Sequence, residues 1–305
     1  MLSETWWGTR VWDRRWGFPM RDPVEPFRTR LLDSFISLLD RSEAADFPLD
    51  FNRYRALVLS GPPQLQRYLS VLGDVWKEGE GKVRWGEKTP VHIWYLPVLH
   101  MMFPQMRAIH LVRDPRATVA SLIKAPFTKL TDPLALAWDW RHSVERALEL
   151  ESQVPMTTFR YEDLVSRPEK TVEAICAAID LPFDPGMLDY KRRSDRYIPR
   201  QPWMHGLGGP LSTSRINRWE NAMGVDDLLY VEAMTAELMQ RLQYETKAPK
   251  RALRKVAPVI AKAHAAQARL AEERSRQITD LVSMQRGAYR DLLATFGPEG
   301  SQFPS

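Results

Sequence analysis

The expected fold follows from one stretch, Ile109-His-Leu-Val-Arg-Asp-Pro-Arg-Ala-Thr-Val-Ala-Ser121, which joins a strand to a helix through a tight turn. Its first part, Ala108–Val112, is branched and apolar and predicts a short β-strand. Asp114 is a candidate N-cap, and Pro115 stands at the first position of the helix that is expected to follow. Arg113 is therefore expected at the carboxyl end of a strand, where open α/β sheets bind ligands.

Strands and helices are expected to alternate on both sides of this stretch. Further strands are predicted at Val83–Trp85 and Met156–Tyr161 from their branched and aromatic content. Apolar spacing and the prolines at helix starts predict helices at Val91–Phe103, Arg116–Lys124, Asp132–Glu151 (with Asp132 as N-cap and Pro133 at the first position), Pro168–Ile179 and Asp226–Leu242. This alternation predicts an α/β fold with a parallel sheet flanked by helices.

The positive charge of the chain is concentrated near its C-terminus. The net charge is +5 over 305 residues, yet residues 246–290 hold eleven Lys and Arg against three Asp and Glu, which leaves −3 for the rest. We therefore expect a domain at 1–246 and a basic helical extension at 247–305. The extension is expected to be either a solvated appendage or a segment that pairs with another helix, for example in self-association, or with an acidic surface. A body of slightly negative charge argues against nucleic acid as a partner.

Several classes of protein are excluded by what the sequence lacks. No stretch approaches the roughly 18 consecutive apolar residues of a membrane helix, and the N-terminus has no apolar signal core, so a cytoplasmic location without a membrane span is expected. The one cysteine, Cys176, excludes an internal disulfide and is expected in the core. A P-loop kinase is disfavoured because the Gly-x-x-x-x-Gly-Lys-Ser/Thr pattern does not occur.

Arg113 is the residue whose predicted position is most suggestive of chemistry. A guanidinium at a strand end can bind a phosphate through two parallel hydrogen bonds. Ser121 lies eight residues later, about two helical turns, so both side chains face one anion only if the turn folds back. The alternative is a structural ion pair for Arg113.

These residues resemble the PAPS-dependent sulfotransferases, especially the tyrosylprotein and carbohydrate sulfotransferases and their bacterial relatives. The resemblance runs from about Leu2 to Trp219 and rests on Glu87-Lys-Thr-Pro90, on Arg113-Asp-Pro-Arg116 with Ser121, on Tyr161-Glu-Asp-Leu164, and on Leu211-Ser-Thr-Ser-Arg-Ile-Asn-Arg-Trp219. It implies a P-loop-NTPase-like α/β fold. It also implies PAPS, 3′-phosphoadenosine 5′-phosphosulfate, as co-substrate, and no metal.

The same resemblance assigns roles to individual residues. It implies that Arg113 and Ser121 hold the 3′-phosphate of PAPS and that Tyr161 lies by the adenine. Lys88 is implied to approach the transferring sulfuryl group. Arg218 is the best match to a basic residue that closes over the cofactor, with Arg215 as the second choice.

One family feature has no counterpart in the sequence. The Pro-Arg-Ser-Gly-Thr-Thr loop that cradles the 5′-phosphosulfate on backbone amides is not found. The opening Met-Leu-Ser-Glu-Thr resembles the segment after the family's first helix, so a strand-loop-helix unit of about 25–30 residues is expected to be missing. We then expect little turnover from the chain as written.

The general base has two candidates. The alignment makes Glu4 the counterpart of the base in the tyrosylprotein branch, and a carboxylate suits proton removal from an attacking hydroxyl. His92 is the other candidate base, although its position after Lys-Thr-Pro also favours a supporting or capping role. Glu87 is expected to pair with Lys88, and His205 lies on a Gly-rich loop that either lines the acceptor site or turns the chain.

Two functions remain open from the sequence. The first is a sulfotransferase that moves a sulfuryl group from PAPS to a hydroxyl, or less readily an amine, of a carbohydrate, lipid or small-molecule acceptor. The alternative is a catalytically inactive, sulfotransferase-like binding or interaction protein that lacks the 5′ loop.

Overall fold

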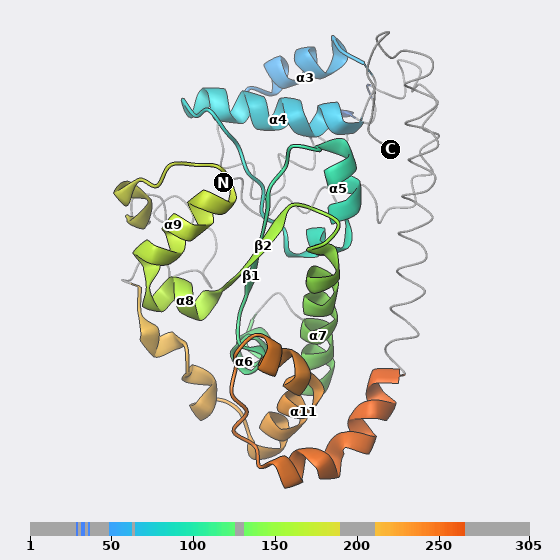
Figure 1. Ribbon diagram of the computed structural model, residues 1–305. Coiled ribbons are helices and arrows are strands. Elements are labelled where there is room, and N and C mark those ends of the chain that lie inside the picture. Colours follow the sequence, from blue (N-terminus) through green and yellow to red (C-terminus); the bar gives the residue numbers. More distant parts are fainter. Residues whose placement is uncertain are drawn as a thin grey trace. The chain divides into compact units, whose positions relative to one another are not determined.

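Figure 1 shows a computed structural model of the chain, which describes residues 49–62, 65–125, 131–189 and 211–265 together with Thr29, Leu32, Asp33 and Ile36. The chain divides into two compact units. Unit 1 comprises Met1–Pro104 and Ser275–Ser305, and unit 2 comprises Gln105–Arg274.

The described part of unit 1 consists mainly of helices. Asp50 caps α3 (Phe51–Leu59) by accepting a hydrogen bond from the Arg53 backbone N–H at 2.9 Å. The Tyr54 hydroxyl of α3 donates to the carbonyl of Tyr68 in α4 (Leu65–Gly79) at 3.0 Å, and both tyrosines are buried. The predicted helix at Val91–Phe103 is confirmed as two consecutive helices. The elements are α3 (Phe51–Leu59), α4 (Leu65–Gly79), the 3-10 helix η2 (Pro90–Trp94) and α5 (Leu96–Met102).

The strand predicted at Val83–Trp85 is wrong, since these residues form irregular chain. Branched side chains favour a strand only where a neighbouring strand and a core accept them. Val83 is 87% exposed and so lacks such a core. Trp85 instead meets Phe103 edge to face with ring centroids 6.0 Å apart, and it lies against Gly73, where any side chain would collide with its ring.

Unit 2 contains a parallel strand pair, as predicted. Strands β1 (Ala108–Val112) and β2 (Met156–Arg160) pair in parallel with Ala108 opposite Met156 and Val112 opposite Arg160. The other elements are α6 (Pro115–Ile123), α7 (Pro133–Leu150), α8 (Tyr161–Ser166), α9 (Pro168–Ala178), the 3-10 helices η3 (Pro185–Leu188), η6 (Thr213–Arg215) and η7 (Arg218–Asn221), and α11 (Val225–Arg241). The predicted strands and helices of this unit agree with these bounds to within one residue, and the predicted α/β class with a parallel sheet is confirmed.

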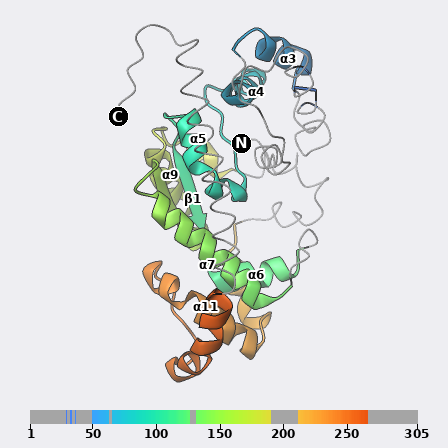
Figure 2. The ribbon, with the colours of Figure 1, turned by 90° about the vertical axis from the view of Figure 1, so that its right-hand side faces the viewer.

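Helices cover the strand pair from opposite sides. Figures 1 and 2 both place α7 on one side of the strands and α9 on the other. Buried Val112 at the end of β1 packs with Trp140 and Val144 of α7 and with Leu238 of α11. A second core joins α6, α7 and α11 around Val119, Leu136, Ala137, Trp138, Val231 and Met234. Both cores lie close to the carboxyl end of β1.

Two predicted helix caps are confirmed. The Asp114 side chain accepts from the Arg116 backbone N–H at 2.8 Å, and Pro115 begins α6. The Asp132 side chain accepts from the Leu134 N–H at 3.0 Å at the start of α7. Because Asp114 is held in this way, the chain leaves β1 through a turn of fixed geometry.

The first part of the basic extension is helical over 250–265. Ile260 is 7% exposed and belongs to the core formed by α6, α7 and α11, whereas neighbouring Val259 is 56% exposed. The predicted boundary at residues 246 and 247 stays a prediction, and the extension beyond residue 265 lies outside the described residues.

The single cysteine of the chain is buried. Cys176 is 4% exposed, as expected of a core cysteine. In the ranges that the structure describes, no helix is long and apolar enough to cross a membrane. Within the same ranges, no cluster of three or more His, Cys, Asp or Glu side chains is placed to hold a metal ion.

Candidate functional site

The carboxyl ends of β1 and β2 place Arg113 beside Tyr161. Val112 and Arg160 are opposite each other in the register, so the next residues, Arg113 and Tyr161, leave the sheet at the same edge. The guanidinium carbon of Arg113 lies 4.7 Å from the centroid of the Tyr161 ring, a cation–π contact. The structure thus brings together two predicted site residues from motifs 48 positions apart in the sequence.

The Arg113 guanidinium keeps donors available for a ligand. Its Nη2 donates to the Arg215 carbonyl at 3.3 Å. Its Nε is buried and has no hydrogen-bond partner among the described residues. A buried donor without a partner is costly, so this nitrogen fits an acceptor such as a phosphate oxygen.

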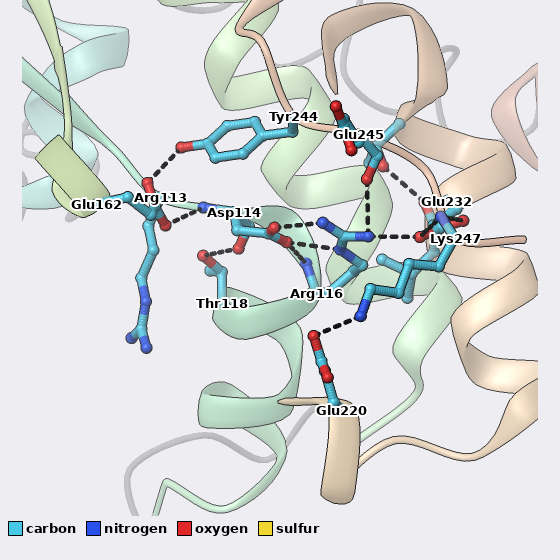
Figure 3. A network of polar contacts seen from close by, with 12 residues as sticks. Arg113, Asp114, Arg116, Thr118, Glu162, Glu220, Glu232, Tyr244, Glu245 and Lys247 are labelled. Carbon is cyan, nitrogen blue, oxygen red and sulfur yellow. Dashed lines mark hydrogen bonds and ion pairs between the residues drawn. The ribbon is translucent and has the colours of Figure 1, made fainter. Parts of the chain in front are cut away.

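Arg116 is buried, and its guanidinium binds carboxylates of the protein itself. Its guanidinium donates to Asp114 (Nη2 to Oδ2, 2.6 Å) and to Glu232 (Nη1 to Oε1, 2.6 Å), and it lies 4.0 Å from the Trp219 ring centroid. Burial alone would lower the pKa of Arg116, but the hydrogen bonds and charges of Asp114 and Glu232 outweigh it and raise that pKa. Figure 3 shows the Arg113 side chain pointing away from this network.

Glu232 connects the Arg116 network to the start of the C-terminal extension. Its fully buried carboxylate accepts from the backbone N–H groups of Lys247 (2.9 and 3.0 Å) and Ala248 (2.7 Å). Lys247 also pairs with Glu220 of η7 at 2.6 Å (Figure 3). These contacts satisfy the buried charge and tie residues 247–248 to α11.

Ser121, Arg215 and Arg218 are placed differently from one another. Ser121 is exposed near the end of α6, and in the described part of the chain it makes no hydrogen bond with Arg113. Arg218 is exposed at the start of η7. Arg215, the second choice from the sequence, is half-buried, and its carbonyl contacts Arg113. The segment Leu211–Trp219 therefore contacts Arg113 through the backbone carbonyl of Arg215.

The remaining described candidates belong to unit 1. His92 lies in η2, and its Nδ1 is 2.6 Å from Glu87 Oε2, while the Thr89 hydroxyl donates to Glu87 Oε1. This pairing puts a proton on Nδ1, and Nε2 is buried with no partner within the described ranges. Lys88 is exposed. Glu87 thus holds His92, a pairing that the sequence did not predict.

Two candidates lie outside the described residues, namely Glu4 and His205. Three residues that the sequence did not single out contact the Arg113 turn or its support, namely Trp140, Glu162 and Tyr244. Glu162 directly follows Tyr161 in a motif that the sequence already marks, so its position was a usable signal. Trp140 and Tyr244 lie in sequence stretches of ordinary amphipathic pattern, so no sequence signal marked them.

A hollow of about 430 Å³ lies beside β2. Its lining includes the cations Arg160, Arg167, Lys170 and Arg241 and the carboxylates of Glu151 and Asp163. Asp163 already pairs with Arg167 at 2.6 Å. The lining contains none of the predicted site residues, although Arg160 also lies 4.3 Å from the centroid of the Tyr244 ring.

The sequence profile of the family described as "Sulfotransferase family" matches residues 37–185. This range contains both strands, the Arg113 turn, Tyr161 and the Glu87–His92 pair. Over these residues the chain is similar to the sulfotransferase family.

Curated relatives carry related names. A "Putative protein-tyrosine sulfotransferase" of Caenorhabditis briggsae is 22% identical over 183 residues, which cover 57% of this chain and 65% of that protein. "Protein-tyrosine sulfotransferase 1" of Danio rerio is 27% identical over 148 residues, which cover 47% of this chain and 39% of that protein. The chain thus spans less than two thirds of the length of either relative.

The "Sulfotransferase Domain from the Curacin Biosynthetic Pathway" aligns with a TM-score of 0.48 and 17% identity, covering 76% of this chain and 83% of that one.

Proposed function

We propose that the protein is a sulfotransferase that transfers a sulfuryl group from PAPS to a hydroxyl group of an acceptor. The observation that carries this proposal is the half-buried Arg113 guanidinium at the end of β1, stacked on Tyr161, with a buried Nε that has no partner among the described residues. A fixed cation with a free donor is what a phosphate monoester requires. The match of residues 37–185 to the sulfotransferase family profile supports PAPS as the source of that phosphate.

Within this proposal, unit 2 binds the 3′-phosphate side of the donor. Arg113 would hold the phosphate, Tyr161 would lie by the adenine, and Ser121 with Arg218 or Arg215 would complete the site. When bound, PAPS supplies an activated sulfuryl group on its 5′ side. Because Arg113 is already held by its neighbours, little side-chain entropy is lost when the anion binds.

The binding role of Arg113 is tested by calorimetric titration of adenosine 3′,5′-bisphosphate. We expect Arg113→Ala to lower the affinity by about 10- to 150-fold, since a hydrogen bond to a charged group contributes about 1.5–3 kcal/mol. Arg107→Ala is the matched control, because Arg107 precedes β1 and pairs with Asp180 at 3.1 Å. Absence of binding by the unaltered protein, or equal affinity of Arg113→Ala, would contradict the proposal.

For catalysis, we propose that Lys88 stabilises the transferring sulfuryl group and that His92 or Glu4 removes the acceptor proton. The Glu87 contact to Nδ1 supports His92, because it leaves Nε2 as the ring atom that can accept a proton. Lys and Arg near the sulfuryl oxygens would stabilise the developing charge.

The role of His92 is tested by steady-state kinetics. His92→Asn is expected to lower kcat by about 10²- to 10⁴-fold, the usual contribution of a general base, while affinity for adenosine 3′,5′-bisphosphate stays unchanged. Glu87→Gln keeps the size of the side chain and weakens its hold on Nδ1, so a smaller loss is expected. If kcat of His92→Asn stays within about threefold of the unaltered protein, Glu4→Gln becomes the decisive variant.

The acceptor is proposed only as a hydroxyl compound, with an amine as the less favoured group. Carbohydrates, lipids and small molecules are the acceptor classes expected from the sequence. The names of the curated relatives add protein tyrosine to the acceptors to be screened. Transfer of ³⁵S from labelled PAPS to representatives of each class would identify the one that is used.

A further inference from the structure

We propose that Glu162 is a positioning residue that, together with Trp140 and Tyr244, fixes the Arg113–Asp114 peptide and so prepares the Arg113 guanidinium for anion binding. This inference rests on the proposed function, because it concerns the same phosphate site. None of the three residues is predicted to touch the donor. They act through the backbone of Arg113.

Both polar groups of the Arg113–Asp114 peptide are held by side chains. The Trp140 indole Nε1 donates to the Arg113 carbonyl at 2.9 Å. The Asp114 N–H donates to Glu162 Oε1 at 3.0 Å. These bonds come from α7 and α8, which both follow β1 in the sequence and are separated from each other by β2. The orientation of this peptide plane is therefore set by two helices and does not depend on the turn alone.

Glu162 is itself fixed by a buried hydroxyl. The Tyr244 hydroxyl donates to Glu162 Oε2 at 2.7 Å, and Glu162 is 8% exposed. Burial and the nearby Glu162 carboxylate raise the pKa of Tyr244, so its hydroxyl stays protonated and continues to donate. With both oxygens engaged, the carboxylate has a single favoured orientation (Figure 3).

The peptide orientation matters because Arg113 holds its guanidinium by few contacts of its own. Those contacts are the Tyr161 ring at 4.7 Å and the Arg215 carbonyl at 3.3 Å. Tyr161 and Glu162 are consecutive, so one short segment supports both the side chain and the backbone of Arg113. A rotation of the peptide would move the guanidinium off the ring and change the direction of Nε. A ligand-binding side chain held by supporting contacts binds with a smaller entropic cost.

The test is a double-mutant cycle read by titration of adenosine 3′,5′-bisphosphate. Glu162→Ala is expected to weaken binding about tenfold, and Glu162→Gln, which keeps an acceptor for the Asp114 N–H, is expected to retain most of the affinity. In the Arg113→Ala background, Glu162→Ala should cause no further loss, because the residue through which it acts is gone. Glu173→Ala, an exposed change of the same charge in α9, is the control.

Equal losses from Glu162→Ala in the two backgrounds would overturn the inference, and so would equal losses from the Ala and Gln variants. If Glu162→Ala does not fold by near-ultraviolet circular dichroism, Tyr244→Phe takes its place in the cycle, with a loss of a few-fold expected only when Arg113 is present. This design separates positioning from general destabilisation, since destabilisation would act with or without Arg113.

A second readout needs no ligand and separates this inference from the proposed function. Absence of binding by the unaltered protein would contradict the proposed function alone. The positioning role is then judged by ¹⁵N relaxation of the Arg113 Nε–H group, which should be rigid in the unaltered protein and in Glu162→Gln and more mobile in Glu162→Ala. Equal mobility of this group in all three proteins would overturn the positioning role.

Discussion

Arg113 and Arg116 lie three positions apart but differ in their partners, because only Arg116 is paired with carboxylates among the described residues. Arg116 is 5% exposed and lies between two carboxylates and the Trp219 ring. Its removal would leave Asp114 and Glu232 buried without their cation, which costs about 3–5 kcal/mol in comparable cases. Arg113 has no carboxylate partner among the described residues, so its loss should affect ligand binding and leave the fold intact.

His110 in β1 makes stability depend on pH. Its Nδ1 lies 3.1 Å from the Thr158 hydroxyl, and burial lowers the pKa of His110, with the nearby Glu151 carboxylate opposing that effect. The unfolded chain binds a proton at about pH 6.5 and the folded chain only at lower pH. Stability should therefore be fully present above pH 6.5 and should fall as pH drops towards the pKa of the folded state.

Urea unfolding at pH 7.5 and 5.5 measures this effect. The loss of unfolding free energy between the two values should be smaller in His110→Gln than in the unaltered protein. Burial also lowers the pKa of His142, so some loss should persist in the variant. Equal losses in the two proteins would show that His110 does not titrate in this range.

At the scale of elements, the start of α7 depends on one exposed side chain. Asp132 accepts from the Leu134 N–H at 3.0 Å, which satisfies a donor that has no partner within the helix. Asp132→Ala should lower the unfolding free energy by about 0.5–2 kcal/mol in chemical denaturation, whereas Asp132→Asn should retain most of it. A similar loss in both variants would argue against the cap as the cause.

The elements of unit 2 were predictable because their signals are local. Asp114-Pro115 and Asp132-Pro133 mark helix starts through side-chain and backbone geometry within a few residues. The Val83–Trp85 strand failed because strand formation depends on a distant partner, which local composition does not report. The same dependence on distant partners limits how much of the site could be predicted. Arg113 could be placed at a strand end, but the role of Arg116 depends on Glu232, 116 residues later.

At the scale of the whole molecule, the basic extension shares a core with unit 2. Ile260 is buried among side chains of α6, α7 and α11, while Val259 next to it is largely exposed. Ile260→Ala should therefore destabilise the protein by about 2–5 kcal/mol, as large-to-small changes in a core do. Val259→Ala should change stability by no more than about 0.5 kcal/mol.

Thermal or urea unfolding of the two alanine variants measures this difference. Near-equal stability of Ile260→Ala and Val259→Ala would mean that the helix over 250–265 contributes little to the fold in solution. A large difference would mean that this part of the extension contributes to the stability of the domain that precedes it.

The Glu232 carboxylate limits where the gene can be shortened. A stop codon after Thr246 looks attractive because the composition changes there, but it would remove the two backbone amides that bind this fully buried carboxylate. It would also remove Ile260 from the core. A shortened version of the protein should therefore end no earlier than residue 265. It then keeps both the backbone amides that bind the buried Glu232 carboxylate and the Ile260 side chain in the core.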